Sequence, residues 1–205
     1  MLSLSFRAFM DGWWLRLPAT KAHPPSSHQA PLACEDSVRP LEKLHRSHLE
    51  GRWVLIAGTV SDPADLENFK RRDSARSNFV NASEASEMSF TGIFGFGDSC
   101  QYLHSNITLE GPSFTLHYSN ITATALHTSC TDCAVIRFDS KSNELKNVYL
   151  FSRGKEVEPK EMEEIRAQVE CLNMPPPLLM DPTKDVCQEQ IVPKPAAGTE
   201  EKTVA

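Results

Sequence analysis

Between residues 53 and 152 the chain alternates short apolar, β-branched runs with clusters of turn-forming residues. Each run has an ordinary strand length, and the breaks between runs carry Gly, Pro, Asn, Asp or Ser, which favour turns. Regularly spaced short strands of this kind are typical of a β-barrel or a β-sandwich. We predict eight strands, at Trp53–Val60, Ala75–Ala82, Met88–Phe96, Tyr102–Leu109, Phe114–Tyr118, Ile121–Thr128, Ala134–Phe138 and Leu145–Ser152.

A helical period follows the last strand. Within Pro159–Leu172, apolar residues recur at intervals of three and four, at Met162, Ile165, Val169 and Leu172, which places them on one face of a helix. Proline is tolerated at the first helical position, so we predict a helix whose apolar face packs on the outside of the sheet. A shorter helical turn is predicted over Ser61–Phe69, because Asp62 followed by proline is a helix start signal.

Glycosylation sequons indicate which strand faces point outward. Three Asn-x-Ser/Thr sequons begin at Asn81, Asn106 and Asn120, and a glycan has to point into solvent. If Asn106 faces out, the two-residue period of a strand puts Leu103 and Ile107 inside. The same argument on the other strands predicts an apolar interior lined by Leu55, Met88, Phe90, Phe94, Leu103, Ile107, Phe114, Leu116, Tyr118 and Tyr149.

Further positions near this interior can be assigned from their parity or from the neighbouring sequence. Ala57 shares the parity of Trp53 and is therefore expected inside. His117 and Arg137 are candidate polar groups near the cavity, although their simple parity points outward. The basic run at residues 70–72 is cut off by Asp73, and we interpret it as a solvated loop.

Length and charge restrict the function. The chain has 205 residues and a net charge of −6, which fits one domain and argues against a nucleic-acid partner. It has no run of about 20 apolar residues that could span a membrane. We interpret residues 1–33 as a leader and linker whose apolar stretch is interrupted by charges, 34–187 as the folded domain, and 188–205 as a disordered acidic tail.

Cysteine usage indicates the compartment. Six cysteines together with three sequons favour a secreted, oxidised and glycosylated protein. Six cysteines allow 15 connectivities, and the sequence alone does not choose among them. His127, Cys130 and Cys133 could supply three zinc ligands, but a second Cys-x-x-Cys is absent, so a disulfide turn is favoured and no metal is expected.

Four segments resemble the lipocalins. They are Gly51–Gly58, Thr128–Cys133, Tyr149–Arg153 and Glu170–Leu172, and within the family they look most similar to the branch of apolipoprotein M, the fish plasma proteins that bind tributyltin or saxitoxin, and α1-acid glycoprotein. The resemblance covers roughly residues 34–190. It implies an all-β fold: an eight-stranded antiparallel up-and-down barrel, or calyx, with one C-terminal helix.

The resemblance also implies structural roles. Gly51 would turn the chain into the first strand, Trp53 would plug one barrel end beneath the segment 40–49, and Arg153 would pack over the Trp53 ring. The implied disulfides join Cys34 to Cys171 and Cys100 to Cys187, which leaves Cys130 to pair with Cys133.

The expected function is that of a secreted monomeric carrier of a small hydrophobic ligand, held without a cofactor and gated by the loop 62–72. The alternative is a lipoprotein-associated carrier of a sphingolipid or phospholipid, as apolipoprotein M is. In this chain, however, Phe151 and Phe138 stand where that protein's head-group site would have Tyr and Glu. A lipocalin-type isomerase would need a free thiol. If all six cysteines pair, none remains, so we expect no enzyme.

Overall fold

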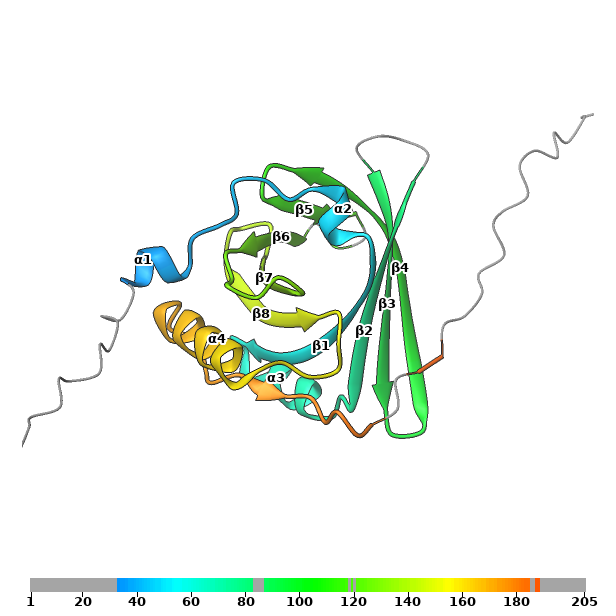
Figure 1. Ribbon diagram of the computed structural model, residues 1–205. Coiled ribbons are helices and arrows are strands. Elements are labelled where there is room, and N and C mark those ends of the chain that lie inside the picture. The colour runs from blue at the N-terminus through cyan, green and yellow to red at the C-terminus, as the bar shows by residue number, and fades with distance from the viewer. Residues whose placement is uncertain (1–32, 83–86, 118, 120, 185–186, 189–205) are drawn as a thin grey trace, which may run out of the picture. The chain divides into compact units, whose positions relative to one another are not determined.

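The computed structural model describes residues 33–82, 87–117, 119, 121–184 and 187–188. The predictions for the leader up to residue 32, for the tail from residue 189, and for Tyr118 and Asn120 therefore lie outside the described residues. Figure 1 shows the barrel and the segments packed on it.

Eight antiparallel strands follow one another around the barrel in chain order, and the pairing of β2 with β1 closes it. This confirms the predicted up-and-down barrel. Its strands are β1 (Gly51–Val60), β2 (Ser74–Asn81), β3 (Glu87–Phe96), β4 (Ser99–Glu110), β5 (Ser113–Leu116), β6 (Ile121–Leu126), β7 (Cys133–Asp139) and β8 (Leu145–Ser152).

The first strand changes partner along its length. Its first half, Gly51–Val54, pairs with β2, whereas Ala57 and Gly58 pair with β9 (Leu178–Leu179), a short strand from the C-terminal arm that the sequence pattern does not reveal. The pairing with β8 shifts register between Leu55 and Ala57. Such a bulge reverses the face on which later residues lie. Ala57 is therefore packed outside the barrel, in the cluster that contains Ile165, and its predicted inward position is wrong.

The predicted C-terminal helix is confirmed as α4 (Pro159–Cys171), which lies outside the barrel (Figure 1). Glu158 and Glu161 form a capping box at its start, which satisfies backbone N–H groups that have no partner within the helix. Met162, Ile165 and Val169 are buried against Val135 of β7 and the outward side chains of β8. The helix thus covers one outer wall and leaves the interior to the strands.

Three shorter helices complete the described part of the chain. They are α1 (Cys34–Ser37), α2 (Arg46–Leu49) and α3 (Pro63–Lys70). The predicted helical turn before residue 70 is confirmed as α3, whose N-cap Asp62 accepts a hydrogen bond from the Ala64 amide at 2.8 Å. No helix in this described part combines the length and the apolar character that a membrane crossing requires.

Antiparallel order gives the barrel two distinct ends. At the α2 end, β1 and β7 begin and β8 finishes, and α2 lies beside them; at the α3 end, β1 finishes, β2 begins and α3 connects the two. All six cysteines are paired, as Cys34–Cys171, Cys100–Cys187 and Cys130–Cys133. The first two pairs are those that the lipocalin resemblance implies, and the third joins the two cysteines that remain. The first joins the segment before the barrel to α4, and the second joins the C-terminal arm to β4.

Candidate functional site

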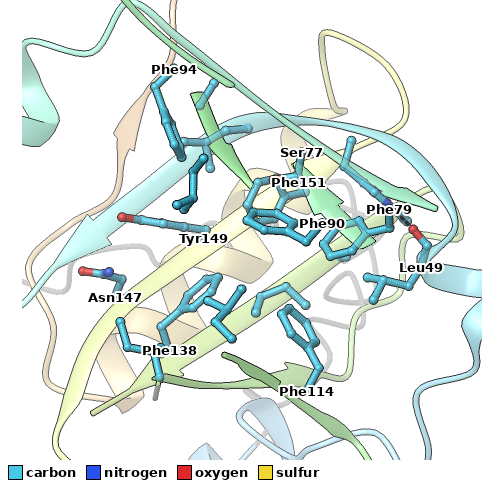
Figure 2. A pocket seen from close by; sticks show the side chains of 18 of the residues that line it. Leu49, Ser77, Phe79, Phe90, Phe94, Phe114, Phe138, Asn147, Tyr149 and Phe151 are labelled. Carbon is cyan, nitrogen blue, oxygen red and sulfur yellow. Dashed lines mark hydrogen bonds between the residues drawn. The ribbon is translucent and has the colours of Figure 1, made fainter. Parts of the chain in front are cut away.

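The barrel encloses a cavity of about 240 Å³. Most of its wall is aliphatic or aromatic, and Figure 2 shows rings from several strands pointing into one space. The lining residues are Leu49, Trp53, Leu55, Arg72, Ala75, Ser77, Phe79, Phe90, Phe94, Leu103, Phe114, Leu116, Ile121, Ala134, Ile136, Phe138, Asn147, Tyr149 and Phe151. A concave, mostly apolar space with a few polar groups is the usual form of a small-molecule site.

The structure brings seven of the ten predicted interior residues onto this wall. They are Leu55, Phe90, Phe94, Leu103, Phe114, Leu116 and Tyr149. Met88 and Ile107 also point inward, but they are fully buried in the core cluster around Trp53 and do not reach the cavity. They are cross-strand partners, and their side chains fill the part of the barrel interior that adjoins the cavity.

Two predicted polar candidates lie elsewhere. His117 is exposed in the turn after β5, where its Nε2 lies 2.8 Å from the Thr108 hydroxyl. Arg137 binds the Asp139 carboxylate from the same face of β7 at 2.8 Å. Both side chains point away from the cavity, as their parity predicts, because side chains two residues apart on a strand share a face.

Several wall residues were missed, on strands that no sequon orients correctly: β7 and β8 carry none, and Asn81 of β2 has the parity of the inner face. Ala75, Ser77 and Phe79 share one face of β2, and Ala134, Ile136 and Phe138 share one face of β7. The β2 set alternates with Arg76, Asn78 and the exposed Val80, so period two could have identified it. The β7 set alternates with Val135, which is apolar and buried in the cluster under α4, so period two gives no clear signal there. Asn147 and Phe151 share the parity of Tyr149 on β8 and carry the same signal.

The α2 end of the cavity is closed by Trp53. The Arg153 guanidinium carbon lies 3.7 Å from the centroid of the Trp53 ring. Arg153 Nη1 donates to the Arg52 carbonyl at 3.0 Å, and Nη2 donates to the His48 carbonyl at 2.8 Å. The indole Nε1–H donates to the Leu49 carbonyl at 2.8 Å (Figure 2). Polar groups at this end are therefore occupied by the protein itself.

Gly51 makes this arrangement possible. Its φ of +94° is a conformation that residues with side chains rarely adopt, and a Cβ there would lie 3.1 Å from Arg153 Nη1. Contact with the ring desolvates one face of the guanidinium and lowers the pKa of Arg153, while the charge of Asp132 raises it. The group stays cationic at any physiological pH.

The α3 end carries a second arginine, Arg72, and the interpretation of residues 70–72 as a solvated loop is wrong for this residue. Its guanidinium carbon lies 4.7 Å from the centroid of the Phe94 ring, 5.2 Å from that of Phe69 and 5.9 Å from that of Phe96. Its Nε is buried and has no hydrogen-bond partner. Arg71, in contrast, is exposed. The spacing of Phe69 and Arg72, three residues apart, is the sequence signal for this contact.

An aromatic group beside Arg72 shapes this end of the cavity. The rings of Phe69 and Tyr149 stack with centroids 5.5 Å apart, and Phe138 lies 5.2 Å from Tyr149. Gly58 permits the stack, because a Cβ there would come within 2.5 Å of Tyr149 Cδ1 and 2.8 Å of Phe69 Cζ. Figure 2 shows the Tyr149 hydroxyl and the Asn147 amide on the side away from Phe114.

The cysteines bear on two other functions, a metal site and a thiol-dependent isomerase. Among the described residues, the Sγ atoms of Cys130 and Cys133 and a Glu161 carboxylate oxygen form a group within 4.8 Å. The two sulfurs are joined as a disulfide, and thiolates are the form that binds metals. No cysteine of the six is free, so the chain offers no thiol for an isomerase mechanism.

Two of the three sequon asparagines are described, and both are exposed: Asn106 on the outer face of β4, and Asn81 at the last position of β2, beside α2. The side-chain oxygen of Asn81 accepts a hydrogen bond from Arg46 Nε at 3.0 Å, and that of Asn106 lies 3.4 Å from the Ser89 hydroxyl. Neither side chain contributes to the cavity wall.

The sequence matches no protein-family model and no curated protein. The fold does have solved counterparts. The siderocalin Ex-FABP, described as functioning through dual ligand specificities, is 16% identical, with a TM-score of 0.57 over 65% of this chain and 93% of that one. Siderocalin Q83, described as having a dual ligand binding mode, is 17% identical, with a TM-score of 0.60 over 72% of this chain and 97% of that one. The protein therefore has a lipocalin fold.

Proposed function

We propose that this protein is a carrier that holds one small hydrophobic molecule inside its barrel. The observation that carries the proposal is the cavity of about 240 Å³ inside the barrel, whose mostly apolar wall is rich in aromatic rings. Burial of a ligand there gains roughly 25 cal/mol per Å² of apolar surface removed from water. The residues proposed to contact the ligand are the lining ones, including the seven expected from the sequence.

The residues at the cavity favour storage over chemistry. The six cysteines are paired, and the polar groups on the wall are Arg72, Ser77, Asn147 and Tyr149. A hydroxyl nucleophile needs an adjacent base, and no histidine or carboxylate lines the cavity in the part of the chain that the structure describes. The two solved neighbours are ligand-binding proteins by their descriptions, which supports the same class of function.

The volume favours a compact or slender ligand. Typical drug-sized pockets begin at about 300 Å³, slightly above the volume found. The loop 61–73, with α3, lies at the α3 end, and we propose that the ligand enters there by displacement of this loop. Trp53 and Arg153 close the other end.

We further propose that the protein acts outside the cell as a glycosylated monomer. Three disulfides persist best in an oxidising compartment, and Asn81 and Asn106 are exposed where glycans could attach. A sphingolipid or phospholipid carrier associated with lipoproteins is the alternative. It is disfavoured because Phe138 and Phe151, both on the wall, stand where the apolipoprotein M resemblance calls for polar residues.

The first experiment is native mass spectrometry of the full chain secreted from a eukaryotic host, before and after extraction with organic solvent. A small lipophile released at near one-to-one stoichiometry would support the carrier function and reveal the ligand class. A protein that is ligand-free and also fails to take up phenylnaphthylamine, an uncharged fluorescent probe, would overturn it.

A further inference from the structure

We propose that Arg72 selects ligands with an oxyanion head, so that the preferred ligand is a short-chain acid or phosphate monoester bound with its tail toward Trp53. This inference rests on the proposed carrier function and specifies its substrate class. It concerns a residue whose position at the cavity follows from the structure and not from the strand pattern.

Arg72 is the only charged residue among the described residues that line the cavity. Its guanidinium lies against the faces of Phe69, Phe94 and Phe96, and no carboxylate forms an ion pair with it among the described residues. The Arg72 side chain is partly exposed, but desolvation of the part that the rings cover is costly for a charge without a paired carboxylate. The unpartnered Nε adds to that cost.

The rings hold the cation without neutralising it. Stacking on aromatic faces occupies the flat sides of a guanidinium, whereas its N–H donors lie in the guanidinium plane and match carboxylate or phosphate oxygens two at a time. The ring contacts therefore orient Arg72 and leave the edge donors as the groups that an anionic ligand would engage.

The polarity of the cavity gives such a ligand one orientation. Two of the other polar lining residues, Asn147 and Tyr149, lie on the side away from Phe114 and Leu49 (Figure 2), whereas Ser77 lies opposite Trp53 on the neighbouring strand. At the α2 end, the indole N–H of Trp53 and one N–H on each of Arg153 Nη1 and Nη2 already donate to backbone carbonyls. A head group that needs hydrogen bonds would remain at the α3 end, and an apolar chain would occupy the aromatic α2 end.

The test compares three ligands with the same tail. Decanoate, decyl phosphate and decanol are titrated into the full chain at neutral pH, with displacement of phenylnaphthylamine as the signal. Without a cation, the cavity would favour decanol, because an anion loses more hydration on entry. We expect the wild type to bind the two anions at least about tenfold more tightly than decanol, the effect of one charge-assisted contact.

Arg72→Met should abolish or reverse this preference while decanol and the probe still bind. Arg72→Lys should keep part of it, because charge remains but the planar donor pair is lost. Arg71→Met is the matched control: it removes the same charge one residue away from an exposed side chain and should leave the preference unchanged. A preference for only one of the two anions would identify carboxylate or phosphate as the natural head group.

The outcomes separate this inference from the carrier proposal. Equal binding of decanol and the anions by the wild type, or an unchanged anion preference in Arg72→Met, overturns the role of Arg72 and leaves the carrier function standing. Failure of all three ligands and the probe to enter the wild-type protein overturns both.

Discussion

Each end of the barrel has an arginine stacked on aromatic rings, but the two arginines differ in their hydrogen bonds. Arg153 covers Trp53 and donates to two backbone carbonyls. Arg72 lies among three phenylalanine rings, and its buried Nε donates to no group. The stacked arginine at the α2 end thus has hydrogen-bond acceptors within the protein, whereas the buried Nε of the stacked arginine at the α3 end has none.

This difference indicates which end maintains the fold and which is available to a ligand. Buried polar groups in proteins are nearly always hydrogen-bonded, so an exception needs a physical reason. At the α2 end the chain itself supplies the partners, and their loss should lower stability. At the α3 end a missing partner can be supplied by a bound anion, so a change there should alter binding more than stability.

The largest effect is expected from the plug. Trp53→Ala should lower the free energy of unfolding by about 3–5 kcal/mol, because a large buried ring would leave a cavity that the rigid barrel cannot fill. Chemical denaturation followed by circular dichroism measures it. Trp53→Phe should cost clearly less. An unchanged unfolding midpoint in Trp53→Ala would show that the ring does not close this end.

A methyl group at Gly58 tests the packing of the α3 end. Gly58→Ala should lower stability by about 1–3 kcal/mol and weaken probe binding, because the new Cβ would overlap the Tyr149 ring. Gly154→Ala is the control, since a Cβ there would meet no atom closer than 3.6 Å. If both variants unfolded alike, the aromatic stack beside Arg72 would not depend on close contact with β1.

The paired arginines give the sharpest comparison. Arg153→Met should lower the free energy of unfolding by about 1–2 kcal/mol, since it removes two hydrogen bonds from a charged donor that is partly exposed. Arg72→Met should change it by no more than about 0.5 kcal/mol, because Met keeps the contact with the rings and removes an unpaired donor. Thermal or denaturant unfolding of both variants, without ligand, measures the difference. Equal losses would remove the distinction between the two ends.

The sequence predicted the barrel well because its strands follow one simple rule. Alternation and turn residues located all eight strands, and the helix face at Met162, Ile165 and Val169 followed from period 3.6. The rule failed at Ala57, where one bulge reverses the inward face of β1. A bulge depends on pairing between distant strands, and a local pattern does not encode it.

The site was only partly predictable for a related reason. Wall residues on β3, β4 and β5 followed from the sequon at Asn106, which fixes the outer face. Arg72 lies between elements, after α3 and before β2, where no period assigns a face. Its guanidinium packs on Phe94 and Phe96 of β3, which lie more than 20 residues further along the chain. Only the assembled barrel therefore shows that this arginine reaches the cavity.

The smallest effect is expected on the outer wall, which belongs to neither end. In protein secreted from a eukaryotic host, Asn106→Gln should remove the mass of one glycan and change stability by less than about 0.5 kcal/mol, because the side chain is exposed and does not line the cavity. Thr108→Ser, which keeps the sequon, should retain the glycan. Intact-mass analysis and unfolding curves measure both.

An unmodified wild type would contradict glycosylation at this site. A large loss of stability or of probe binding in Asn106→Gln would mean that the outer face of β4 supports the cavity, and that the functional contrast is not confined to the two ends.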